Sequence, residues 1–210
     1  AEVHRGDFTP HIVFGRAGSW SEIAAVLRAA GESATAELGA DLEAWLDGGD
    51  DLTRLDTLQR IAALAHDGVR TVNLPTGAWS RAPRPVADVY ASAVATPWEQ
   101  ALLALALLKA AGFAPELGFF TRWSDFAKSV AAPGHLGDLR VVAPLDDQHW
   151  WLAPSRAAAW PGQCDLSGRT GLFLEAAGGE RTWKVPAGAG HCGVAVHLAL
   201  VDGEENIEAT

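Results

Sequence analysis

The sequence predicts an α+β fold, in which helices occupy the first half of the chain and an antiparallel sheet forms in the second. Three observations lead to this prediction. Apolar residues recur with helical spacing in the first third of the chain, a helix that is apolar on nearly every side follows near the middle, and short β-rich runs divided by Gly, Pro and Asp fill the rest. We expect the central helix to pack on all sides, with the sheet against it.

The first third of the chain contains three amphipathic patterns, within residues 18–32, 33–49 and 51–68. Ser19 and Glu22 have the spacing of a capping box, which predicts the start of the first helix. The second pattern stops at a Gly-Gly pair, which favours a helix C-terminus. In the third pattern, leucines recur at spacings of three and four. We therefore predict three successive amphipathic helices.

The middle of the chain predicts a short strand at 71–75, a short helix at 85–90 and then the central helix, which opens with the stretch ATPWEQ. Thr96 is the predicted N-cap, and Pro97 suits the first helical position, where its fixed φ is favourable and its missing N–H is not needed. Glu99, three residues after Thr96, completes a capping box. This helix start therefore has a purely structural explanation.

Six β-rich runs follow the central helix, and their antiparallel pairing is expected because short turns connect several of them. Asp146, Asp147 and Gln148 separate two of the runs and predict a hairpin turn. The predicted strands lie within residues 116–120, 138–144, 149–154, 170–176, 181–186 and 193–201.

Composition argues against several classes of function. Asp and Glu outnumber Lys and Arg by 26 to 16, which gives a formal net charge of −10, whereas a nucleic-acid groove needs clustered cations. No segment stays apolar for the roughly 18–20 residues that cross a bilayer, so we expect no membrane insertion. The seven histidines lack the spacing of known metal sites. We expect neither a metal nor a cofactor.

The two cysteines, Cys164 and Cys192, allow either one disulfide in an exported protein or two unpaired thiols without chemistry. Cys192 adjoins His191, but adjacent residues of a strand point to opposite faces. This histidine is therefore poorly placed to act as the base of a cysteine nucleophile.

Three stretches carry a resemblance to a known family: PRPVADVYASAVATPWEQALLALALLKAAGFAPELGFF, LGDLRVVAPLDDQHWWLAPS and CDLSGRTGLFLEAAGGERTWKVP. In this order they resemble the transglutaminase-like (papain-like cysteine protease) superfamily, in particular the bacterial domains that follow a DUF3857 β-domain. The resemblance implies a lead-in from a preceding domain at 1–15, the transglutaminase-like domain at 16–186, and the start of a following β-domain or a C-terminal strand at 187–210. It also implies an exported parent protein, periplasmic or secreted.

The family uses a Cys at the start of the central helix, a His on a following strand and an Asp in a phrase like WLDP, so that the helix N-terminus and an imidazolium stabilise a thiolate. In this chain the family's Cys corresponds to Pro97, and its Asp corresponds to Ala153 in the phrase WLAP. The family's His corresponds to Asp138, or to His135 if the preceding loop is shorter. The resemblance therefore implies that the catalytic triad is lost.

A groove beside the lost nucleophile is the candidate binding site, in which Trp98 either lines the groove or plugs it. The expected function is that of a catalytically inactive structural module, or of one that binds a protein, peptide or glycan, with other domains of the parent chain as partners. The alternative is an active cysteine protease or transglutaminase-like enzyme with a displaced nucleophile. The candidate groove residues are Trp98, Glu99, Asp138, His149 and Trp150.

Overall fold

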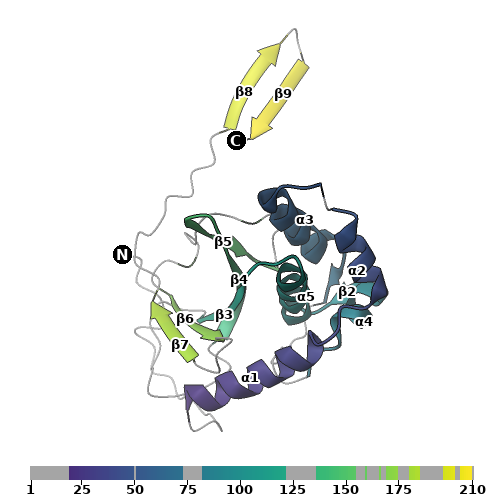
Figure 1. The fold of residues 1–210 in the computed structure, drawn as a ribbon. Coiled ribbons are helices and arrows are strands. Elements are labelled where there is room, and N and C mark those ends of the chain that lie inside the picture. Colours follow the sequence, from purple (N-terminus) through teal and green to yellow (C-terminus); the bar gives the residue numbers. More distant parts are fainter. Residues whose placement is uncertain are drawn as a thin grey trace.

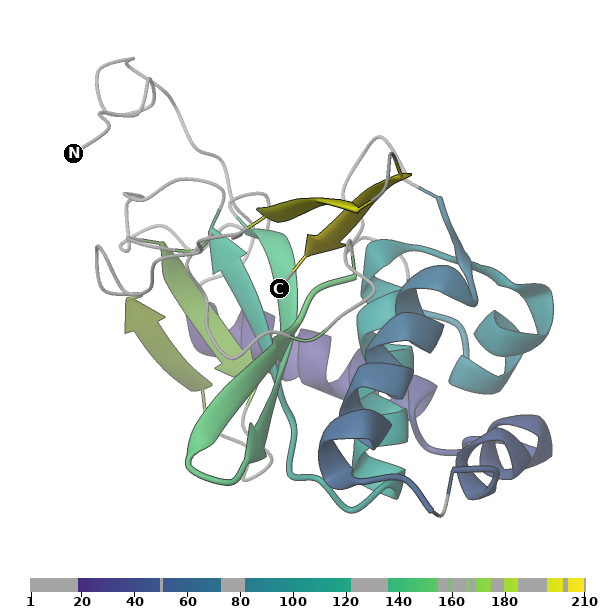
Figure 2. The ribbon, with the colours of Figure 1, turned by 90° about the horizontal axis from the view of Figure 1, so that it is seen from above.

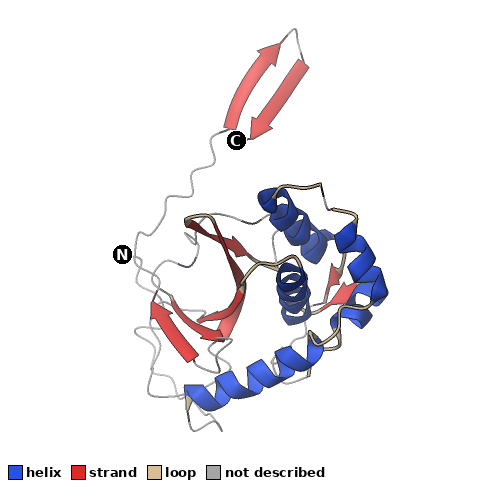
Figure 3. Ribbon diagram, viewed as in Figure 1, coloured by secondary structure: helices blue, strands red, loops and turns tan. Residues whose placement is uncertain are grey.

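The computed structural model describes residues 19–49, 51–72, 82–121, 136–154, 159, 166, 169–174, 180–184, 196–201 and 204–209. Five helices occur in this part of the chain, coloured blue in Figure 3: α1 (Trp20–Ala34), α2 (Ala40–Asp47), α3 (Arg54–Asp67), α4 (Val86–Ser92) and α5 (Pro97–Ala110). The strands are β1 (Arg70–Thr71), β2 (Val94–Ala95), β3 (Glu116–Thr121), β4 (Leu136–Leu145), β5 (Gln148–Leu152), β6 (Thr170–Leu174), β7 (Glu180–Lys184), β8 (Val196–Val201) and β9 (Glu204–Ala209). The predicted α+β class is confirmed.

The main sheet has five strands in the order β5-β4-β3-β6-β7, and every neighbouring pair is antiparallel. Helix α5 lies between this sheet and the helices α3 and α4 (Figure 1). Figure 2, seen from above, shows α2 to α5 gathered on one side of the sheet. Helix α1 packs on β6 and β7, and its buried residues belong to the same core as those of α5. The helices therefore cover one face of the sheet, which we call the helix face.

Helix α5 is buried on all sides, as its sequence predicts. Every residue from Trp98 to Leu108 is buried, because one side of the helix packs on the sheet and the other on α3 and α4. The helix ends at Ala110, and Gly112 just beyond its cap has a φ of 77°, the left-handed conformation that glycine adopts readily. The Gly112 N–H donates to Lys109 O and the Phe113 N–H donates to Leu108 O, which together form a Schellman motif.

The other face of the sheet carries a separate aromatic cluster, which consists of Phe120, Val142, Trp151, Leu166 and Phe173. The ring centroids of Phe120 and Phe173 are 5.6 Å apart, and the rings meet edge to face at 89°. Gly171 makes room for this arrangement, since a Cβ there would lie 2.5 Å from Phe120 Cε1. We call this side the aromatic face.

Local differences from the predicted elements have identifiable causes. The first helix runs on to Ala34, and the second begins only at Ala40, because Gly39 with φ 81° separates them. The short strand predicted at 71–75 is found as β1, which covers only Arg70–Thr71, and residues 73–75 lie outside the described residues. Strand β1 pairs in parallel with β2, which is too short to produce an alternating pattern in the sequence. The predicted hairpin turn at Asp146 and Asp147 is confirmed, with Asp146 in the left-handed conformation at φ 53°.

Strands β8 and β9 form an antiparallel hairpin of their own, with Val196 opposite Ala209. A strand within 193–201 is therefore confirmed. Its assignment to a following β-domain stays a prediction.

Candidate functional site

The start of α5 carries the capping box that the sequence predicts. The Glu99 N–H donates to Thr96 Oγ1 at 3.2 Å, and the Thr96 N–H donates to Glu99 Oε2 at 2.8 Å. Pro97 is the first helical residue. The position at which the resemblance places a nucleophilic sulfur therefore holds a proline inside a complete structural cap.

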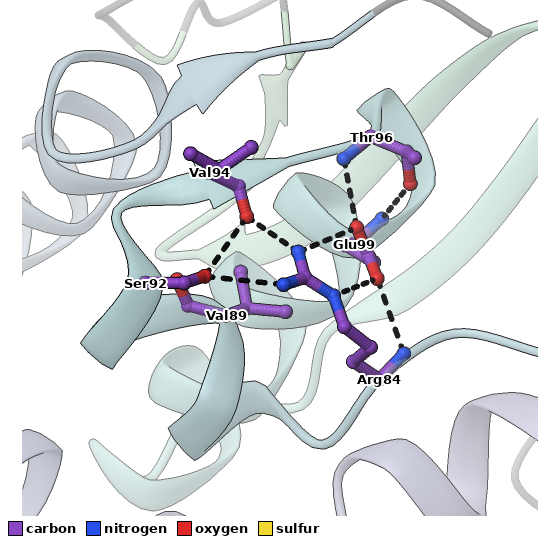
Figure 4. Close-up of polar contacts among 6 residues, drawn as sticks. All are labelled: Arg84, Val89, Ser92, Val94, Thr96 and Glu99. Atoms are coloured by element: carbon purple, nitrogen blue, oxygen red, sulfur yellow. Dashed lines mark hydrogen bonds and ion pairs between the residues drawn. The ribbon is translucent and has the colours of Figure 1, made fainter.

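Arg84 fixes Glu99 from the opposite side (Figure 4). Arg84 Nε donates to Glu99 Oε1 at 2.8 Å, Nη2 donates to Oε2 at 3.2 Å, and the Arg84 N–H donates to Oε1 at 3.2 Å. The same guanidinium donates to Ser92 Oγ and to Val94 O. Arg84 thus joins the segment before α4, the end of α4, β2 and the start of α5 in one hydrogen-bond network.

The charge state of Glu99 follows from these contacts. Burial by itself would raise the pKa of this carboxyl, which is 6 % exposed, but the hydrogen bonds from Arg84 and from the Thr96 and Arg84 backbone lower the pKa from 4.5 to about 2. The hydrogen bond to Glu99 raises the pKa of Arg84. Both groups are charged at neutral pH and fully engaged with each other. Glu99 is therefore unsuited to donate or accept a proton in catalysis.

Trp98 follows Pro97 and is only 2 % exposed, as part of the main hydrophobic core. It fills the interior beside the start of α5 and lines no open surface. This burial argues against the lining role of the two roles considered for Trp98, and the groove itself stays a prediction.

Asp138 lies on β4 directly opposite Phe120, a member of the aromatic face. Its carboxylate accepts a hydrogen bond from Arg169 Nη1, and Arg140 Nη1 lies 3.9 Å from Oδ1. Residues that face each other across a strand pair project to the same side of the sheet. Asp138 therefore lies on the face away from α5, in an ion-paired cluster. His135 lies outside the described residues.

Ala153 follows β5 and lies on the helix face. It borders a small cavity together with residues of α3, α5 and the adjoining strands: Ala62, Ala65, Gln100, Ala101, Ala104, Val141, Leu152 and Pro154. The structure thus brings Ala153 against α5 but places Asp138 on the opposite side of the sheet. A methyl group at residue 153 offers no acceptor to orient an imidazole.

Gln100 is the residue of this region that the sequence analysis did not single out. It is fully buried in α5, and Thr71 Oγ1 donates to its Oε1 at 3.2 Å. The signal in the sequence was an amide side chain just before the apolar run of α5, since a buried amide needs hydrogen-bond partners.

The remaining groove candidates lie on β5, close to the hairpin turn. His149 is exposed and pairs with Pro144, whereas Trp150 is half-buried, pairs with Ala143 and packs against the main core. Adjacent strand residues point to opposite faces. The five candidates are consequently divided, with Trp98, Glu99 and Trp150 on the helix side and Asp138 and His149 on the aromatic side.

A larger pocket of about 70 Å³ lies between α1, α5 and the strands β3 and β6. Leu102, Leu105 and Leu117 contribute apolar walls, and Arg28 and Lys109 contribute positive charge. This pocket contains none of the predicted groove residues.

Other predicted features fall outside the described residues, namely Cys164, His191 and Cys192. Their pairing and reactivity stay predictions. Within the described part of the chain, no three His, Cys, Asp or Glu side chains gather as a metal site would require. No helix among the described residues is both long and apolar enough to span a membrane.

Comparison with solved structures finds a similar fold. No family model matches the chain, and no curated protein matches it in sequence. A crystal structure from Parabacteroides distasonis ATCC 8503, of a protein named "a putative protease", is similar with a TM-score of 0.62 and 17 % sequence identity. The match covers 79 % of this chain but only 31 % of that protein. The chain therefore shares a fold with part of a much longer protein.

Proposed function

We propose that this chain is a transglutaminase-like domain that has lost its catalytic triad and works as a non-catalytic module of a larger, exported bacterial protein. The observation that carries the proposal is the start of α5. Proline occupies the nucleophile position there, and the adjoining carboxylate of Glu99 is fixed by the capping box and by Arg84. A helix start occupied in this way stabilises the fold and has no group to attack a substrate.

Two further positions support the loss of catalysis. Ala153 has no carboxylate, and Asp138 lies on the sheet face away from α5 in an ion pair with Arg169. An active cysteine site needs its base within hydrogen-bond reach of the nucleophile. The fold shared with a protein named as a putative protease agrees with an origin in a catalytic family.

Between the two non-catalytic roles, the geometry favours the structural one. Trp98 is buried, and the predicted groove residues are divided between two faces of the sheet. A protein, peptide or glycan partner would therefore bind at a surface other than the predicted groove. The periplasmic or secreted location belongs to the same proposal and rests on the resemblance.

The proposal is tested by assaying the whole chain for hydrolysis of labelled casein and for incorporation of a fluorescent amine into casein. We expect neither reaction to proceed faster than in a heat-inactivated sample. Cys164→Ala and Cys192→Ala variants serve as controls. Turnover that disappears in one of these variants would identify a displaced nucleophile and would establish the enzyme alternative.

A further inference from the structure

The pocket between α1, α5 and the strands β3 and β6 has apolar walls. Leu105 and Leu117 are 7 % and 3 % exposed, and they line it together with the fully buried Leu102 and the half-buried Pro115 and Leu174. The volume of the pocket is about 70 Å³. Because an apolar cavity of about 150 Å³ holds one benzene molecule, a space of this size holds about three carbon atoms. The apolar part of the pocket therefore fits a short, branched aliphatic group.

Two charged side chains of opposite sign lie at the mouth of this pocket. Glu32 of α1 and Lys109 of α5 both line the pocket, and both are exposed. Lys109 follows Leu102 and Leu105 at helical spacing, so its aliphatic stem continues the apolar wall while its ammonium group stays in water. Neither Glu32 nor Lys109 makes a side-chain hydrogen bond or an ion pair with another described residue. Both charges are therefore available to a ligand.

Arg28 adds a second positive charge to the wall of the pocket. It lies one turn before Glu32 on α1 and is half-buried. The chain as a whole has a formal net charge of −10, whereas two cations and one anion line this pocket. A carboxylate is therefore attracted to this part of the surface, although the net charge of the molecule repels anions. An amino group finds its partner in Glu32.

We propose that this pocket binds a free aliphatic α-amino acid of the size of valine. The isopropyl group has three carbons and enters the apolar part, the α-carboxylate pairs with Lys109, whose flexible stem lets it reach the ligand, and the α-ammonium pairs with Glu32. A peptide terminus carries only one of these two charges and satisfies half of the site. The pocket is separate from the predicted groove, and the inference holds whether or not the chain is catalytic.

Binding is measured by ¹H–¹⁵N NMR titration of the whole chain with L-valine. We expect saturable shifts of the backbone amides of Gly31, Thr35 and Lys109, with a dissociation constant of about 1 mM because the ligand is small. Isovalerate is valine without the ammonium, and isobutylamine is valine without the carboxylate. Each should bind about fivefold more weakly than valine. Phenylalanine, whose ring exceeds the space, should cause no saturable shift at these amides.

Two charge-removing variants assign the roles of the side chains at the mouth. Lys109→Met should weaken the binding of valine and isovalerate about fivefold and leave that of isobutylamine unchanged. Glu32→Gln should weaken the binding of valine and isobutylamine by a similar factor and should not weaken that of isovalerate. Arg70→Met and Glu37→Gln are the matched controls, because both residues are exposed and neither lines the pocket. All four changes are on the surface, so the fold should be retained.

Two results would overturn the proposal. One is the absence of saturable shifts with valine, or an affinity for valine that is the same in the wild type and in both variants. The other is isovalerate that binds as tightly as valine and is unaffected by Glu32→Gln, which would show a site for an aliphatic carboxylate and not for an amino acid.

Discussion

Replacing Arg84 by methionine removes the cation that holds Glu99 at the start of α5, and it leaves a buried carboxylate whose remaining donors are backbone N–H groups. The fall of the pKa of Glu99 from 4.5 to about 2 corresponds to about 3 kcal/mol in favour of the charged form. The Arg84 side chain is 43 % exposed, so screening by water reduces this figure to about 2 kcal/mol. We expect Arg84→Met to lower the free energy of unfolding by that amount at pH 7.

The contribution of Glu99 to stability depends on pH. The pKa of Glu99 is lower in the folded chain than its ordinary 4.5, so its contribution is fully present above pH 4.5 and is lost as the pH falls from 4.5 to about 2. The difference between the wild type and Arg84→Met should therefore shrink over this interval.

Urea denaturation followed by tryptophan fluorescence, repeated from pH 7 to pH 2.5, measures this difference. Arg70→Met is the matched control, because Arg70 is exposed on β1 and its replacement should change the free energy of unfolding by less than about 0.5 kcal/mol. Two results would refute the role given to the ion pair. One is a difference in unfolding free energy between the wild type and Arg84→Met that stays constant with pH. The other is a difference at pH 7 no larger than that of the control.

Three further outcomes are expected. Gly171→Ala should lower the free energy of unfolding by about 1–3 kcal/mol in urea denaturation, since its Cβ would lie 2.5 Å from Phe120. The Cβ of Gly112→Ala would meet nothing within 4 Å. This variant should therefore lower the free energy of unfolding by only about 1–2 kcal/mol, through its positive φ. Trp98→Ala should lower the free energy of unfolding by about 3–5 kcal/mol because the indole is buried in the core, and a fully stable variant would show that Trp98 lines an open groove. In the casein assays, no hydrolysis is expected from the variant that introduces the triad implied by the sequence resemblance, Pro97→Cys with Asp138→His and Ala153→Asp, because Asp138 lies on the sheet face away from α5.

The elements that local sequence determines were predictable. The capping box of α5 depends on residues three positions apart, and Thr96 and Glu99 form it as expected. The hairpin turn at Asp146 and Asp147 is equally local. Continuous apolar character along α5 correctly indicated burial on all sides.

Features that depend on tertiary contacts were not predictable from the sequence. Arg84 lies 15 positions before Glu99, and nothing in the local pattern connects the two. A register shift between Phe120 and Thr121 inserts an extra residue, Gly137, into β4, so Leu136 belongs to the main core although Asp138, two positions later, lies on the aromatic face. A shift of one residue reverses the face of a strand residue, and counting along the chain cannot reveal it.

The central claim, that this domain has no working nucleophile, is tested most directly by the reactivity of its two thiols. The whole chain is alkylated with iodoacetamide at neutral pH, native and denatured, with and without reductant, and the labelling rates of Cys164 and Cys192 are read by mass spectrometry. We predict that neither cysteine of the native chain reacts faster than the same cysteine of the denatured, reduced chain. Markedly faster labelling of one native cysteine would reveal an activated thiolate and would contradict the assignment of a non-catalytic domain.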